Sequence, residues 1–96
     1  MYARVARFTG QDAETIEKNV SGIRERSESG PPEGVPATGF RMLVDEANGT
    51  TVGISFYETE EDMRKGDATL NEMTPPAGSG NRSSVDLCEV KIELDV

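Results

Sequence analysis

Apolar residues alternate with other residues in two neighbouring segments, residues 37–45 and 51–58. A period of two is typical of β-strands with one buried face. Asn48-Gly49, between the segments, is a common turn dipeptide. We therefore predict a β-hairpin. The alternating apolar residues are Phe40, Met42 and Val44 in the first strand and Val52, Ile54 and Phe56 in the second.

The length of the turn decides which hairpin residues share a face. A two-residue loop at Asn48-Gly49 would put Val44 opposite Gly53 and separate the apolar sets. A three-residue loop, with Gly49 in the left-handed region, puts Val44 opposite Val52 and brings both sets onto one face. The pattern predicts this three-residue loop, which also places Met42 opposite Ile54 and Phe40 opposite Phe56.

The first part of the chain predicts a strand followed by a helix. Residues 2–8 alternate weakly and are apolar on both faces, which suits a central strand and leaves open which faces Arg4 and Arg7 occupy. Asp12 is the predicted N-cap of a helix that ends near Ser27, because an apolar stripe with helical spacing follows it. The stripe consists of Ala13, Ile16, Val20 and Ile23.

A second helix is predicted after the hairpin, with Thr59 as its N-cap and Asp62 in its first turn. Gly66 is unfavourable inside a helix, so it indicates a close approach to the sheet. Loops containing Pro-Pro are predicted at residues 29–36 and 74–81. The inward stripe of the helix consists of Met63, Gly66, Leu70 and Met73.

The last strand is predicted over residues 83–94, and its apolar phase changes along its length. Val85 and Leu87 set one phase, and the apolar residues from Val90 to Leu94 set the other. The change falls at Cys88-Glu89. It predicts either a bulge at this point or a strand end that pairs with a second subunit.

The order of elements is β-α-β-β-α-β within a single domain, residues 1–96. Short connections and right-handed crossovers favour an α+β, ferredoxin-like fold. We expect a four-stranded antiparallel sheet with both helices on one face.

Composition narrows the classes of function. The net charge is −8, from 10 basic and 18 acidic residues, which argues against nucleic acid and anionic membranes as partners. No apolar run reaches transmembrane length, and we expect a cytoplasmic protein. With no histidine and only Cys88, the chain predicts neither a metal site nor an intrachain disulfide, and we expect no cofactor. Cys88 fits an inert strand residue better than a reactive thiol, because no histidine or cluster of cations lies near it in sequence.

The chain resembles the dimeric α/β-barrel superfamily, in particular the small bacterial proteins similar to antibiotic-biosynthesis monooxygenases. The resemblance implies a homodimer in which two ferredoxin-like sheets enclose a cavity. Family members often carry a tryptophan and a histidine near the second helix, and this chain has neither; Gly66 and Asp67 stand near the place of the histidine. No catalytic residue is therefore carried over. The residues that carry the resemblance are 1–8, 43–45 and 53–62.

The predicted register leaves one hairpin face uncovered by helices, and this face carries the candidate ligand site: Tyr57, Arg41 and Ser55. Tyr57 either orients a ligand or covers Gly39 across the strands. Arg41 either binds an anionic group or pairs with an acid across a dimer interface. Gly39 and Gly53 would make the face concave.

Two functions follow from these expectations. The first is binding of a small apolar molecule in the barrel cavity without catalysis. The alternative is a cofactor-independent monooxygenase or isomerase, in which Tyr57 and Arg41 would stabilise an anion. The fold alone does not choose between them.

Overall fold

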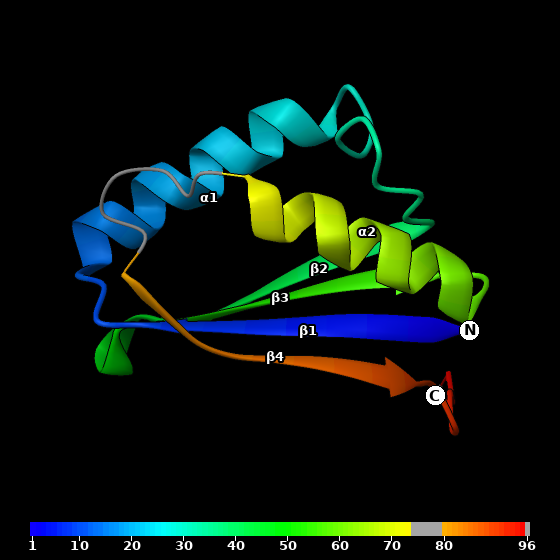
Figure 1. Cartoon of the computed structure of the whole chain (residues 1–96). Coiled ribbons are helices and arrows are strands. Elements are labelled where there is room, and N and C mark those ends of the chain that lie inside the picture. Colours follow the sequence, from blue (N-terminus) through cyan, green and yellow to red (C-terminus); the bar gives the residue numbers. More distant parts are fainter. Residues whose placement is uncertain (74–79, 96) are drawn as a thin grey trace.

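The computed structural model describes residues 1–73 and 80–95, and Figure 1 shows two helices above one face of a single sheet. The predicted loop at 74–81 therefore lies mostly outside the described residues. The elements are β1 (Tyr2–Thr9), α1 (Ala13–Ser27), β2 (Gly39–Asp45), the short 3₁₀ helix η1 (Glu46–Asn48), β3 (Thr50–Tyr57), α2 (Glu60–Glu72) and β4 (Asn81–Glu89).

The sheet has four strands in the order β2-β3-β1-β4, and each neighbouring pair is antiparallel. Both helices lie on the same side of it (Figure 1). The predicted α+β, ferredoxin-like arrangement is confirmed. The other side of the sheet has no helix among the described residues, and we call it the open face.

Both helices begin at the residues that the sequence predicted. The Asp12 carboxylate accepts a hydrogen bond of 2.7 Å from the backbone N–H of Thr15. The Thr59 hydroxyl accepts one of 3.1 Å from the backbone N–H of Asp62. Such caps satisfy amide groups that lack a partner in the first turn.

The hairpin register differs from the predicted one by one residue. Asp45 lies opposite Thr50, so four residues connect the strands instead of three. Asp45 stabilises the 3₁₀ turn, because its carboxylate accepts a 2.7 Å hydrogen bond from the Asn48 side-chain amide. Gly49 adopts the predicted left-handed conformation, and a Cβ there would clash with the Gln11 carbonyl oxygen. The turn is thus determined by contacts that the alternation pattern does not contain.

This shift separates the two apolar sets of the hairpin. Phe40 packs near Gly53 on the helix side, where Met42 and Val44 also lie, so the predicted side is correct for this strand. Phe40 and Val44 are nevertheless 47% and 40% exposed, so the helices do not cover them as predicted. Val52, Ile54 and Phe56 lie on the open face, so the prediction that they lie under the helices was wrong. A slip of one residue reverses the face of every side chain in a strand.

The core is small and lies between α2 and the sheet. Tyr57 is fully buried at its centre and packs with Val35 and Met63. Ile16, in the predicted stripe of α1, is also fully buried. Met73, the last residue of the predicted α2 stripe, is exposed and follows the helix.

Strand β4 pairs regularly with β1 through Cys88 and Glu89, so the predicted bulge at those residues was wrong. The register shift lies instead near Ser83, where Arg7 pairs with Ser84 and Phe8 with Arg82. The strand ends at Glu89, before the residues with the second apolar phase. The phase change therefore marks the end of the strand.

Candidate functional site

The sheet divides the three residues of the predicted ligand site. Tyr57 and Ser55 point toward the helices and are buried, whereas Arg41 lies opposite Ile54 on the open face and is exposed. The expectation that Tyr57 and Ser55 line the open face was wrong, because it depended on the incorrect register. Arg41 alone lies where the sequence analysis placed it.

Tyr57 is held tightly on the helix side. Its hydroxyl forms a hydrogen bond of 2.9 Å with the hydroxyl of Ser55. Gly66 of α2 lies directly on the ring: a Cβ at Gly66 would be 2.6 Å from the Tyr57 oxygen and 2.7 Å from its ring carbon Cε1. The predicted close approach at Gly66 is confirmed. Tyr57 lies opposite Tyr2 of β1. The interpretation in which Tyr57 covers Gly39 was therefore wrong, because Gly39 lies opposite Phe56.

A charged network lies beside this aromatic centre. Arg4 is only 6% exposed, and its Nε donates to the Asp67 carboxylate at 2.8 Å. Arg4 Nη2 and Arg82 Nη1 both donate to the side-chain oxygen of Asn71, at 3.3 and 2.6 Å. These contacts fix α2 to β1 and β4. A buried guanidinium needs such partners, because an unpaired buried charge is strongly unfavourable.

The sequence analysis did not find this network. The weak alternation of β1 left the side of Arg4 undecided. The signal was present in α2, where Asp67 and Asn71 are four residues apart and therefore lie on one helix face. Both residues come shortly after Gly66, and Gly66 had already indicated that this part of the helix approaches the sheet.

The open face is organised as three rows that cross the sheet in the order β2, β3, β1, β4. We name each row after its β2 residue. The Gly39 row is Gly39-Phe56-Ala3-Cys88, the Arg41 row is Arg41-Ile54-Val5-Asp86, and the Leu43 row is Leu43-Val52-Arg7-Ser84.

The centre of the open face is apolar except for Arg7, and its edges are polar or small except for Leu43. Val5, Val52, Ile54 and Phe56 are half-buried by their neighbours, and Leu43 is 52% exposed. Adjacent apolar side chains on a face without a covering layer mark an interaction surface in soluble proteins. This face is the candidate functional surface.

A hollow of about 150 Å³ lies at the hairpin end of the open face. The hollow is lined by three members of the Leu43 row, Leu43, Val52 and Arg7. The rest of its lining consists of Val44, Asp45 and Thr50. The hollow therefore combines apolar walls with one basic residue, Arg7, and one acidic residue, Asp45. Arg41 lies two residues from Leu43 on the same face.

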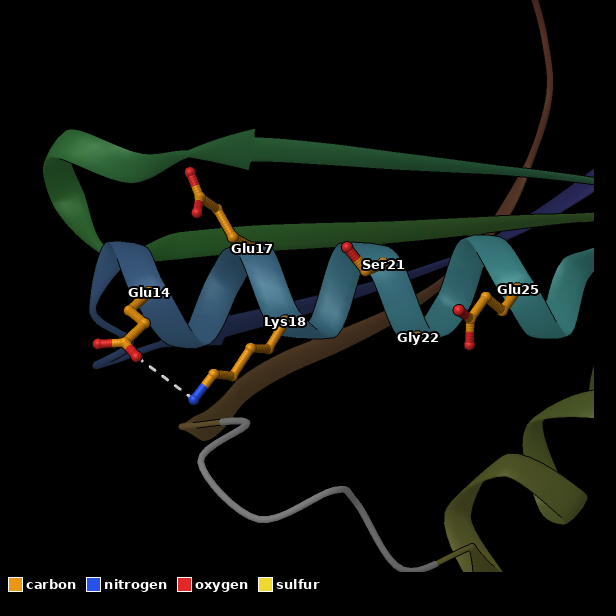
Figure 2. A pocket seen from close by; sticks show the side chains of 6 residues that line it. All are labelled: Glu14, Glu17, Lys18, Ser21, Gly22 and Glu25. Carbon is orange, nitrogen blue, oxygen red and sulfur yellow. Dashed lines mark ion pairs between the residues drawn. The ribbon is translucent and has the colours of Figure 1, made fainter.

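A second hollow, of about 480 Å³, runs along α1 (Figure 2). All its lining residues belong to this one helix, and Figure 2 shows them projecting from successive turns. Lys18 pairs with Glu14 at 3.4 Å, and both side chains are largely exposed. A single helix surface without an opposing wall does not enclose a ligand.

The residues after β4 extend away from the sheet. The Val90 N–H still donates to the Met1 carbonyl oxygen at 2.9 Å, but Ile92 and Leu94 are each 79% exposed. Lys91 donates a hydrogen bond to the Glu89 carboxylate, which lowers the pKa of Glu89 and raises the pKa of Lys91. Pairing of this segment with a second subunit stays a prediction.

No protein-family model matches the chain, and no curated protein is significantly similar to it. Neither helix in the described ranges is long and apolar enough to cross a membrane. Within residues 1–73 and 80–95, no three acidic or cysteine side chains gather as metal ligands would. The candidate function therefore depends on the geometry of the open face.

Proposed function

We propose that the protein is a homodimer joined through its open faces, as in a dimeric α/β barrel, and that it binds a small apolar molecule between the two sheets. The observation that carries this proposal is the apolar centre of a sheet face over which the described residues place no helix. Covering such a face removes apolar surface from water, which favours association.

The small core makes such an association more favourable. Tyr57, Val35 and Met63 form the buried cluster beneath α2, whereas Ile54 and Phe56, which are comparable in size, remain on the other side. Small domains with limited cores often gain stability by oligomerising. A second copy supplies a matching apolar face.

The ligand is placed at the hollow beside Leu43, Val52 and Arg7. One hollow of about 150 Å³ is small for a ligand site. In a face-to-face dimer the second sheet closes the hollow and enlarges the enclosed space toward roughly 300 Å³, the lower end of the usual range. Arg7, which lines the hollow, provides a polar contact that orients a ligand in a mostly apolar site, and Arg41 lies nearby on the same face.

The proposal is binding without catalysis. The alternative reaction needed a phenol and a guanidinium beside one ligand. Tyr57 bonds to Ser55 under α2, on the opposite side of the sheet from Arg41. The open face offers Arg41 without Tyr57, which supports binding more than oxygenation or isomerisation.

Light scattering or sedimentation equilibrium tests the dimer. The protomer mass is 10.4 kDa, and we expect twice this mass at micromolar concentration. Leu43→Asp should produce monomers, because it places a charge in the apolar contact. Phe40→Asp is the matched control: Phe40 lies on the same strand and is similarly exposed, but it points to the helix side and does not line the hollow. A wild-type monomer would contradict the proposal.

Thermal-shift screening with small apolar compounds tests the ligand site. Val52→Trp should abolish stabilisation by the compounds found, because it fills the hollow. Glu17→Trp, in the hollow along α1, is the control and should retain their binding. Compounds that bind the Val52→Trp protein equally well would place the ligand elsewhere.

A further inference from the structure

Arg41 and Asp86 stand at opposite ends of one row on the open face. Arg41 is on the edge strand β2, Asp86 is on the other edge strand β4, and both are exposed. Three strand spacings separate them, about 14 Å, which is too far for an ion pair within one chain. Neither side chain has an ion-pair partner in the described part of the protein.

A face-to-face homodimer places the twofold axis in the plane between the sheets. If the axis runs parallel to the strands, β2 of one copy lies over β4 of the other and each row lies over itself reversed. Arg41 of each copy then faces Asp86 of the other. If the axis runs along the rows, Arg41 faces Arg41 and Asp86 faces Asp86.

Side-chain sizes agree with the axis parallel to the strands. In that arrangement the large Phe56 lies over Ala3 of the second copy, and Gly39 lies over its Cys88. In the Arg41 row, Ile54 lies over Val5. The aromatic side chain of this face thus meets a small one, as close packing of two sheets requires. The charges select this axis, and the side-chain sizes are compatible with it.

We propose that two copies associate about a twofold axis parallel to the strands, with Arg41 of each paired to Asp86 of the other. This inference rests on the proposed homodimer and specifies its geometry. Two symmetric pairs at the edges fix the register of the apolar centre, because complementary charges orient an interface and like charges oppose alternative arrangements. The partner is a second copy of this chain.

Charge reversal tests the pairing. Arg41→Asp and Asp86→Arg should each raise the dimer Kd at least about tenfold, because each places like charges together twice. A mixture of the two single variants should form heterodimers with wild-type affinity, since both pairs are then complementary. The double variant should also dimerise like wild type. Arg24→Asp and Glu17→Arg, on α1, repeat the charge changes away from the open face and should not alter Kd.

The outcomes separate this geometry from the proposed function. If wild type is a monomer, the homodimer itself is overturned. If wild type is a dimer and both single variants dimerise equally well, the pairing is overturned while the dimer stands. If the single variants dimerise weakly and neither their mixture nor the double variant regains the wild-type dimer Kd, the pairing is also overturned. Should a reversal variant fail to fold, Arg41→Gln and Asp86→Asn repeat the test, each with an expected rise of about threefold.

Discussion

Phe56 and Tyr57 are adjacent aromatic residues on opposite faces of the same strand. Tyr57 is fully buried, its hydroxyl bonds to Ser55, and α2 packs on its ring through Gly66. Phe56 is half-buried by its own sheet, and neither α1 nor α2 lies over it. The helix side thus holds the buried core beneath α2, whereas the open face leaves apolar side chains such as Phe56 only half-buried.

The arginines show the same contrast. Arg4 is buried and bonded to Asp67 and Asn71, whereas Arg41 is exposed and unpaired within the described residues. Buried charge needs partners within the fold. Exposed charge on an apolar face is available to a second molecule. Substitutions on the two faces should therefore change different quantities: monomer stability on one and association on the other.

Tyr57→Ala should have the largest effect on stability. Loss of a buried aromatic side chain should lower the free energy of unfolding by about 4 kcal/mol. Phe56→Ala is the matched control on the open face. Made in a variant expected to be monomeric, such as Leu43→Asp, it should lower the free energy of unfolding by about 1 kcal/mol or less. Urea denaturation measures both. Equal losses at the two positions would contradict the contrast between the faces.

Asp67→Ala should come next, with a loss of about 3 kcal/mol, because it leaves the Arg4 charge buried without its carboxylate partner. Replacing both residues, with Arg4→Met and Asp67→Leu, should recover much of that loss. The same denaturation measurement applies. If Asp67→Ala unfolds like wild type, the buried pair does not hold α2 to the sheet.

Gly66→Ala should destabilise the protein by about 2 kcal/mol, because the new methyl group would meet the Tyr57 ring. Gly22→Ala in α1 is the control. A Cβ there would have its nearest neighbour at 4.0 Å, so we expect a gain of about 0.5 to 1 kcal/mol from helix propensity. If both substitutions lower the stability, or if neither does, the result would argue against a close contact between α2 and the sheet at Gly66.

The smallest effect concerns the cap of α1. The hydrogen bond from the Thr15 backbone N–H lowers the pKa of Asp12. A lowered pKa in the folded state means that the cap stabilises above the ordinary aspartate pKa and that this contribution is lost as the pH falls through the folded value. The stability difference between wild type and Asp12→Ala should therefore narrow in acid. An NMR titration that gives Asp12 an ordinary pKa would contradict this.

The sequence by itself determined the elements and their order. Capping by Asp12 and Thr59, the apolar stripes and the close approach at Gly66 are local signals, because each depends on residues a few positions apart. Together with the rules for connections, they were sufficient for the ferredoxin-like fold.

Only the tertiary structure decided which side chains of the hairpin lie on which face of the sheet. The extra residue in the turn depends on Asp45, Asn48 and the packing of Gly49 against Gln11, which is far from it in sequence. Both faces of the hairpin are partly apolar, so alternation alone could not show which face α2 covers. One residue of register moved Tyr57 and Ser55 from the expected ligand site into the core and left Arg41 on the open face.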